Sequence, residues 1–438
     1  MDAPREDPAA ARRRRPRRKK DPHDAGGAAS PAKDAGAGGR SVAARSPSSR
    51  VSNSSSSAGR GNPRNVVAGR ASSSPARPGT PFDEDAMGPE PELGGRCRAD
   101  DGTWLAWELA LPRAGASPSR PLVILVNGLS NDGMQWRRLK PAMTRTHAVL
   151  SWDYRGHGCS ADPTDVSSVS IRALAGDLER VLADARVRSG GAVSTRRVAL
   201  VAYSLGCQVA LEWCRGNSHR VCGLALVLGS CRHAMTGALR WKPVADVAAA
   251  AMRIAPAPAA YAWDCFTAFA FAFSYASHLA ARLFGMLRVK YVDFEPFYRH
   301  LKRLHAGSYT RMLISGQEHS AMDVLELVDR REIPTLIVTG GKDVTASASG
   351  VRAMHHAAPR ADFVHLPGAC HAGMIGEAEA VGDAIGAFLD RAAETLEFNR
   401  ARVLAATGVD IFAEDADEDD EDAVYFSRSA PTSPTTRG

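Results

Sequence analysis

The sequence has eight cysteines but no Cys-x-x-Cys pair. A zinc ribbon and a thioredoxin-type redox site both need such closely spaced cysteines, so neither is expected. Several of the cysteines stand in apolar runs, where a free thiol packs as a small hydrophobic side chain, and this usage fits a reducing compartment better than a secretory one. The cysteines are Cys97, Cys159, Cys207, Cys214, Cys222, Cys231, Cys265 and Cys370.

An apolar stretch is also lacking in residues 1–20, which excludes a secretory signal there. The same segment carries Arg and Lys runs that suit a nuclear address, contact with an anionic surface, or simply a solvated basic tail. No aromatic residues interleave with these cations, so nucleic-acid binding is not expected. Acidic residues among the first seven disfavour an organelle transit peptide, and we predict an intracellular, cytoplasmic protein.

Both ends of the chain lack apolar periodicity. Residues 1–93 are rich in Ala, Gly, Ser, Pro and Arg, and residues 410–438 are acidic first and then rich in Ser, Thr and Pro. We predict that both segments are disordered tails. The net charge of +7 and the pI of about 9.1 therefore combine two tails of opposite charge and do not indicate a basic binding face.

Between the tails, strand-like and helix-like segments alternate. This alternation predicts an α/β fold with a doubly wound, mostly parallel sheet, and a core that comprises residues 94–231 and 331–398. The 44% hydrophobic content is sufficient for such a core. The expected strands are 103–109, 121–126, 148–152, 197–201, 221–228, 334–339 and 362–366, and the expected helices are 171–187, 207–213 and 377–396.

Residues 232–330 interrupt the alternation with helical segments, and we predict that they form a helical cap inserted between two strands. Residues 265–281 within it are uncharged, at the lower limit of the length that spans a bilayer. We favour a buried or substrate-facing cap helix, because His278 is polar and Asp264 and Arg282 flank the stretch. Peripheral membrane contact and a true membrane span are the alternatives.

Ala202-Tyr203-Ser204-Leu205-Gly206 places a serine between small residues, after an apolar strand and before a helix. A sharp strand-to-helix turn of this kind exposes a nucleophilic hydroxyl at the edge of a parallel sheet, and it needs little bulk two residues before and after the serine. The usual pattern is Gly-x-Ser-x-Gly, so Ala202 is a departure that a methyl group can accommodate. We predict Ser204 as the nucleophile.

Two further residues stand at the carboxyl ends of later strands. His371, in the loop after the last predicted strand, is the predicted base, and Asp343, directly after the preceding strand, is the predicted acid that orients it. Asp343 could instead serve as a helix-capping turn residue. Asp323 and Glu332 are the alternative acids.

The backbone N–H groups of Leu129 and Leu205 are the predicted oxyanion donors. Leu205 follows the nucleophile, and Leu129 lies in the loop after the first buried strand, where Gly128 lets the chain turn inward. Acyl transfer through these groups needs no metal and no organic cofactor.

The order serine, aspartate, histidine resembles that of the α/β-hydrolase fold superfamily, over residues 95–396. The chain looks most like the capped serine esterase and lipase-like group, and residues 153–160 match the Asp-x-Arg-Gly-x-Gly-x-Ser turn common there, which implies a structural role for His157. Asn127 stands where that group usually has His, and the usual proline shortly after the acid is missing. Because dehalogenases and epoxide hydrolases of this superfamily use a carboxylate nucleophile, the serine at the strand-to-helix turn argues against their chemistry.

We therefore predict a serine hydrolase that cleaves a carboxylic ester through an acyl-enzyme. The Phe, Ala and Leu content of residues 232–330 favours a small-molecule ester with an apolar or lipid-like acyl group. An acyltransferase that uses the same three residues is one alternative. A non-catalytic binding protein of the same fold is another.

Overall fold

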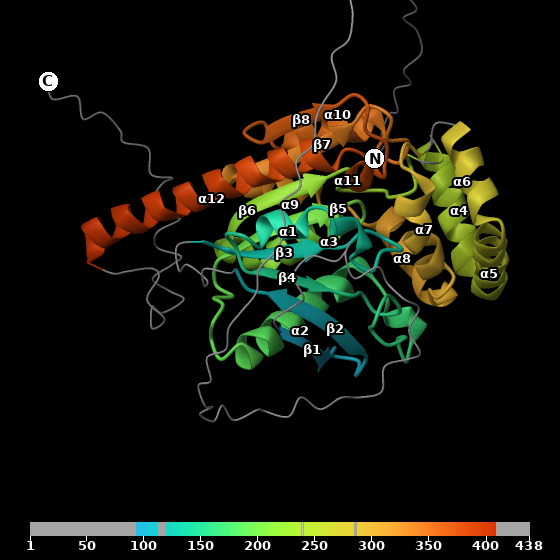
Figure 1. The fold of residues 1–438 in the computed structure, drawn as a ribbon, viewed down its shortest axis with the longest axis horizontal. Helices are drawn as coiled ribbons and strands as arrows, with labels where there is room; N and C mark the ends of the chain where they lie inside the picture. The colour runs from blue at the N-terminus through green and yellow to red at the C-terminus, as the bar shows by residue number, and fades with distance from the viewer. Residues whose placement is uncertain (1–92, 113–119, 238, 240, 284–286, 409–438) are drawn as a thin grey trace, which may run out of the picture. The chain divides into compact units, whose positions relative to one another are not determined.

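The continuous apolar runs form an eight-stranded sheet in the computed structural model, which describes residues 93–112, 120–237, 239, 241–283 and 287–408 (Figure 1). The strand order is β1-β2-β4-β3-β5-β6-β7-β8. β2 pairs antiparallel with both β1 and β4. The strands β4, β3, β5, β6, β7 and β8 run parallel to one another. The strands are β1 (Leu93–Arg98), β2 (Trp104–Ala110), β3 (Leu122–Val126), β4 (Val149–Trp152), β5 (Val198–Tyr203), β6 (Val221–Val227), β7 (Thr335–Gly340) and β8 (Asp362–Leu366).

Helices cover both faces of this sheet (Figure 1). Leu178 of α2 and Val209 of α3 pack with Ile124 in one apolar cluster, while Phe388 of α12 packs in a second cluster with Val123. The predicted α/β fold with a doubly wound, mostly parallel sheet is confirmed. The core helices are α1 (Lys140–Met143), α2 (Ile171–Arg188), α3 (Gly206–Asn217), α10 (Ala348–Ala357), α11 (Gly373–Gly376) and α12 (Ala378–Thr407).

The central strands are apolar on both faces because both faces are covered. Every residue of β3 is buried, and alternate side chains of the strand enter the two clusters, Ile124 on one side and Val123 and Leu125 on the other. Such strands appear in a sequence as unbroken hydrophobic runs. Their parallel direction brings the carboxyl ends of β5, β7 and β8 to one edge of the sheet.

Two core elements differ from the prediction. β1 was not expected, and the last helix, predicted over residues 377–396, continues to Thr407. Residues 397–407 contain neither glycine nor proline, so nothing ends the helix before Gly408. Gly408 has a φ of 75°, the left-handed conformation that commonly terminates a helix. The predicted tails, 1–93 and 410–438, lie outside the described residues except for Leu93, the first residue of β1.

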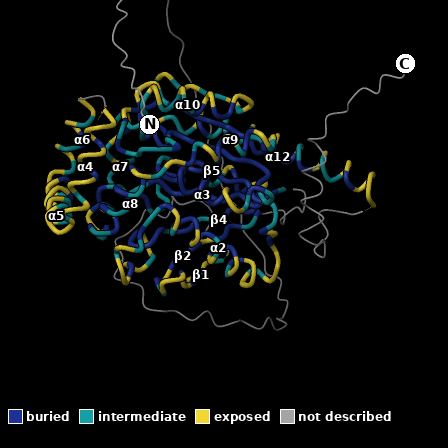
Figure 2. Tube along the Cα trace, turned by 180° about the vertical axis from the view of Figure 1, so that it is seen from behind, coloured by how far each residue is buried: buried dark blue, intermediate teal, exposed yellow. Residues whose placement is uncertain are grey.

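Helices fill the chain between β6 and β7, in the region predicted as a cap. The apolar stretch 265–281 is divided between two of these helices, which meet at Phe273, rather than forming one buried helix. Most of its large side chains are exposed (Figure 2). Within the described residues, no helix is both long and apolar enough to cross a bilayer, which was one of the two alternatives to a cap helix. The helices are α4 (Lys242–Ile254), α5 (Pro256–Ala272), α6 (Ser274–Leu283), α7 (Tyr291–Leu301), α8 (Ala306–Glu318) and α9 (Met322–Arg330).

A buried ion pair fixes the turn that follows β4. Arg155 donates from Nε to Asp177 Oδ2 at 2.9 Å and from Nη1 to Asp101 Oδ2 at 2.7 Å. The side chains of Arg155 and Asp177 are almost fully buried. Burial raises the pKa of Asp177 above its ordinary value despite the opposing effect of the guanidinium. The turn, α2 and the segment after β1 therefore depend on one cation.

Replacing that cation should be costly. We expect Arg155→Met to lower the free energy of unfolding by about 3–5 kcal/mol, because it leaves the Asp177 carboxyl buried without its counter-charge. Urea denaturation measures the change. Arg180→Gln is the matched control, since its pair with Asp100 is exposed and should contribute less than about 1 kcal/mol. Equal losses for the two variants would contradict this account.

Candidate active site

Ser204 lies at the turn between β5 and α3 in a strained backbone conformation. Its φ is 56°, the left-handed region that few non-glycine residues adopt. The Ser204 N–H donates to the carbonyl oxygen of Val227 at 3.0 Å, which ties the turn to β6. A Cβ at Gly206 would lie only 2.5 Å from the carbonyl oxygen of Asn127, so the turn needs glycine there. Ala202, two residues before the serine, is fully buried.

His371 lies beside this serine although 167 residues separate them in the chain. His371 Nε2 is 2.9 Å from Ser204 Oγ, within hydrogen-bond distance. The imidazole stacks on the ring of Tyr203, with centroids 5.3 Å apart, and the Tyr203 hydroxyl donates to the His371 carbonyl oxygen at 2.8 Å. Tyr203 therefore holds both the ring and the backbone of His371.

Asp343 approaches the other nitrogen of the same imidazole. Asp343 Oδ2 is 3.1 Å from His371 Nδ1, and its carboxyl group is buried. Burial alone raises the pKa of Asp343, but the charge of His371 and the hydrogen bonds from His371 and Thr345 outweigh it, so this pKa is below its ordinary value. An ionised Asp343 keeps the proton on Nδ1 and leaves Nε2 free to accept the proton of the Ser204 hydroxyl.

Thr345 belongs to this group, and sequence reasoning missed it. Its hydroxyl donates to Asp343 Oδ1 at 2.6 Å and lies 2.7 Å from His371 Nδ1. The Thr345 N–H also donates to Asp343 Oδ1, at 2.8 Å. The loop thus fixes the carboxylate without the usual proline. The only sequence signal was a hydroxyl residue two positions after the acid.

The predicted oxyanion donors flank the serine. Leu205 directly precedes α3, and the loop that contains Leu129 backs onto the turn, since a Cβ at Gly128 would lie 3.0 Å from Ser204 Cβ. Within the described chain, the N–H groups of Leu129 and Leu205 donate to no other protein group.

Asn127 holds the Leu129 loop in place through its side-chain amide. Its Nδ2 donates to the carbonyl oxygen of Trp152 at 2.9 Å, and its Oδ1 accepts hydrogen bonds from Gln135 Nε2 and Trp136 Nε1. Asn127 is almost fully buried. The amide thus joins the loop after β3 to the end of β4 and to residues 135 and 136.

The remaining sequence candidates lie elsewhere. Asp323 pairs with Arg215 at the surface. Glu332 precedes β7 and therefore lies at the opposite end of that strand from Asp343. His157 is buried, with Nδ1 3.1 Å from the carbonyl oxygen of Arg155. No group of three or more His, Cys, Asp or Glu side chains in the described part of the chain could hold a metal ion.

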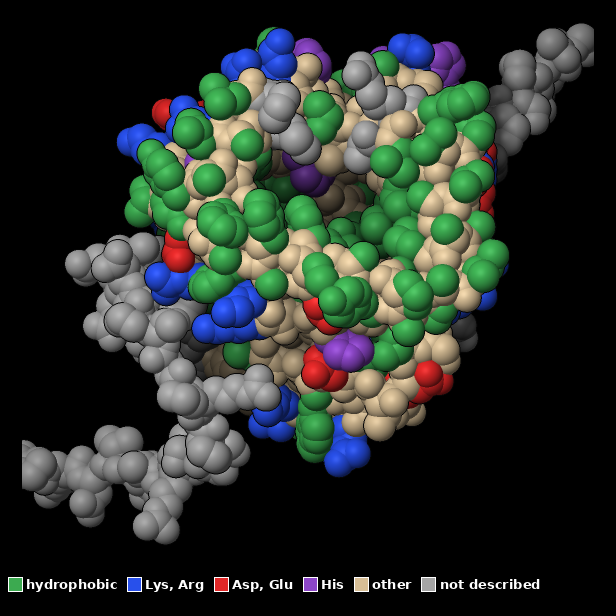
Figure 3. Space-filling model, turned by 90° about the vertical axis from the view of Figure 1, so that its right-hand side faces the viewer, with side chains coloured by type: hydrophobic (Ala, Val, Ile, Leu, Met, Phe, Trp, Pro, Cys, Tyr) green, Lys and Arg blue, Asp and Glu red, His purple; other side chains and the backbone are tan. Residues whose placement is uncertain are grey.

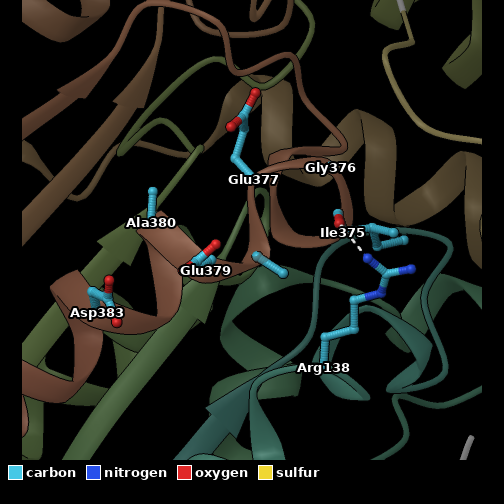
Figure 4. A pocket seen from close by; sticks show the side chains of 8 residues that line it. Arg138, Ile375, Gly376, Glu377, Glu379, Ala380 and Asp383 are labelled. Carbon is cyan, nitrogen blue, oxygen red and sulfur yellow. Dashed lines mark hydrogen bonds between the residues drawn. The ribbon is translucent and has the colours of Figure 1, made fainter. Parts of the chain in front are cut away.

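A groove of about 410 Å³ is lined by Arg138, the end of α11 and the start of α12 (Figure 4). Arg138 donates across it to the carbonyl oxygen of Ile375 at 3.4 Å. Ser204, Asp343 and His371 do not line it. This groove is therefore separate from the serine, histidine and aspartate group.

Comparison with known proteins bears on these observations. A model of the Alpha/beta hydrolase family matches residues 123–384, more than half of the chain. The chain belongs to this family. The match runs from β3 into α12 and includes Ser204, Asp343 and His371. The family assignment made from the order of these three residues is confirmed.

The chain is similar in sequence to RutD of Klebsiella pneumoniae subsp. pneumoniae, which is provisionally named a carbamate hydrolase. It is 25% identical over 287 residues, which cover 64% of this chain and 96% of the relative. The similarity therefore extends over nearly the whole length of RutD.

Solved structures share the family fold at low identity. An esterase from Exiguobacterium antarcticum superposes with a TM-score of 0.52 at 16% identity, over 68% of this chain and all of the other. A bromoperoxidase from Bacillus anthracis gives the same TM-score, identity and coverage. A thermophilic esterase from Thermogutta terrifontis gives 0.51 at 20% identity, over 69% and 99%. Because these names differ, the fold alone does not decide the reaction.

Thr345 offers a test of the site geometry. We expect Thr345→Val to slow the reaction of Ser204 with a fluorophosphonate about tenfold to a hundredfold, because a hydrogen bond to the Asp343 carboxylate is lost. The substitution should also raise the pKa of Asp343 toward its ordinary value. Labelling rates measured across a pH series detect both effects.

Thr345→Ser is the matched control, because it keeps the hydroxyl and should retain most of the labelling rate. Loss of rate in both variants would contradict a role for the hydroxyl and would instead indicate that the Thr345 methyl group packs the loop.

Proposed function

We propose that the protein is a serine hydrolase that cleaves carboxylic esters through an acyl-enzyme. The observation that carries this proposal is the continuous hydrogen-bonded path from Ser204 Oγ through His371 to Asp343, at 2.9 and 3.1 Å. Nucleophile, base and orienting acid within such distances of one another are the requirements of acyl transfer by serine.

In the proposed reaction, Ser204 Oγ attacks the ester carbonyl while its proton passes to His371 Nε2. Asp343 stabilises the resulting imidazolium, and the negative oxygen of the tetrahedral intermediate accepts from the N–H groups of Leu129 and Leu205. His371 then protonates the leaving alcohol as the carbon–oxygen bond breaks. Water, deprotonated by His371, attacks the acyl group and frees Ser204.

Two features of the helices between β6 and β7 favour a substrate with an apolar acyl group. Gly316 of α8 lies against the side chain of Leu205, where a Cβ would be 2.5 Å from Leu205 Cδ1, so the insertion reaches the nucleophile turn. The insertion is rich in Phe, Ala and Leu. We infer that an apolar segment in contact with the turn of Ser204 favours apolar acyl or aromatic esters over polar ones.

Carbamates are a second substrate class, because the RutD relative is provisionally named a carbamate hydrolase. The carbamate carbonyl would be attacked in the same way. The two classes separate in one assay that compares matched esters and carbamates of the same alcohol.

Two rival functions give different products from the same assay. An acyltransferase would pass the acyl group from Ser204 to an alcohol instead of water, so product analysis with an added alcohol acceptor detects it. A non-catalytic binding protein of this fold would neither release an acid nor form an ester.

The test of the proposal is nucleophile replacement. We expect Ser204→Ala to abolish fluorophosphonate labelling, and to lower kcat/KM for a short-chain aryl ester roughly 10⁴-fold or more, because the attacking oxygen is removed. Ser349→Ala, at an exposed position on α10, is the matched control and should behave as wild type. A wild type that neither labels nor turns over esters would sink the proposal and favour a binding role.

A further inference from the structure

Exposed apolar side chains gather on the helices between β6 and β7. Among the described residues, thirteen of the eighteen large hydrophobic side chains that are exposed lie within residues 239–292. Figure 3 views the molecule from this side and shows hydrophobic side chains spread around a hollow, with Lys and Arg side chains toward the margins. Apolar patches of this extent on a soluble protein mark contact surfaces.

α5 presents a stripe of phenylalanines away from the core. Phe266, Phe269 and Phe273 recur at helical spacing, and each is more than half exposed. The rings of Phe269 and Phe273 are 5.0 Å apart. The inward side of the helix is different, with Thr267 and Ala270 buried.

α6 and the segment before α4 carry further exposed apolar side chains. Tyr275 and Leu279 are one turn apart on α6, and both are exposed. Trp241, which precedes α4, is 65% exposed. We name as the apolar face the exposed side chains of Trp241, Phe266, Phe269, Phe273, Tyr275 and Leu279.

The composition of α5 shows that this exposure is unusual. Asp264 is the only charged residue of α5, and the helix is apolar on nearly all sides. A helix of this kind is stable in water only when neighbours cover it. The described part of the chain covers just one side, which leaves the other side open to a partner.

The charges around the apolar face favour an anionic partner. The described residues within 239–292 include five Lys or Arg and two Asp. Asp246 already accepts hydrogen bonds from Lys242 and Gln317. Among the described residues, Arg282 and Lys290 form no ion pair, and both are exposed.

We propose that the apolar face binds the surface of an anionic lipid bilayer, with α5 and α6 lying in the plane of the interface. Trp and Tyr rings suit this depth because one end is apolar and the other polar. The cations then meet lipid headgroups. A second copy of the chain is a poorer occupant, since two faces with the same surplus of positive charge would repel each other.

Vesicle binding tests the proposal without any turnover, so its outcome is independent of the proposed ester chemistry. The full chain is mixed with phosphatidylcholine vesicles that contain or lack phosphatidylserine, and the bound fraction is measured by sedimentation. We expect binding to the anionic vesicles. Phe269→Ser/Phe273→Ser should weaken it at least about tenfold, because two apolar rings no longer leave water. Arg282→Gln/Lys290→Gln should weaken it roughly tenfold as well.

The matched control is Phe398→Ser/Leu404→Ser, which removes two exposed apolar side chains from α12 and should bind as wild type. Melting temperatures within a few degrees of wild type verify that the variants fold. Size-exclusion chromatography with light scattering runs in parallel.

Three results would overturn the proposal. The first is no binding of wild type to anionic vesicles. The second is binding that the phenylalanine variant leaves unchanged, which would assign the contact to another segment, such as the basic residues 12–20. The third is a dimer that the same variant dissociates, which would assign the apolar face to a second copy of the chain.

Discussion

The left-handed backbone of Ser204 is the constraint on which the site depends. A serine has little reason to adopt a φ of 56° unless its surroundings leave no alternative. Here β5, which precedes it, is entirely buried, and α3, which follows, is buried for most of its length. The close approach of Gly206 to the Asn127 carbonyl then fixes where the helix begins. Burial on both sides supports the strain, and the strain directs the hydroxyl toward His371.

The sheet explains why three distant residues meet, and why sequence could anticipate it. Parallel strands that are buried on both faces appear as unbroken apolar runs, so β3, β5, β6 and β7 were recognisable. Once the strands are known to be parallel, residues that directly follow them share one edge. Ser204, Asp343 and His371 each follow such a strand, and their order in the chain was sufficient to place them together. Their chemical roles remain predictions.

Other features depend on contacts that no local pattern records. β1 reads Leu-Gly-Gly-Arg-Cys-Arg, a weak strand signal, yet Gly95 is needed because the indole of Trp107 occupies the space where its Cβ would lie. Thr345 joins the site only because its loop folds back onto Asp343. No proline or glycine at Phe273 indicates in the sequence that α5 ends there and α6 begins. The exposure of the phenylalanines on α5 likewise follows from which neighbours cover that helix, and periodicity cannot supply this information.

The insertion between β6 and β7 is mechanically joined to the site, which limits how it can move. Gly316 of α8 abuts Leu205, and the backbone of Gly237 packs directly against the carbonyl of Thr345 in the acid loop. Gln317 Oε1 accepts a hydrogen bond from the Met235 N–H, which holds the segment before α4 against the end of α8. The insertion therefore contacts the site from two sides, at Leu205 and at Thr345. α5, which carries most of the apolar face, packs against α8, and α8 in turn contacts Leu205 beside Ser204, so the apolar face and the candidate site belong to one continuous packing arrangement.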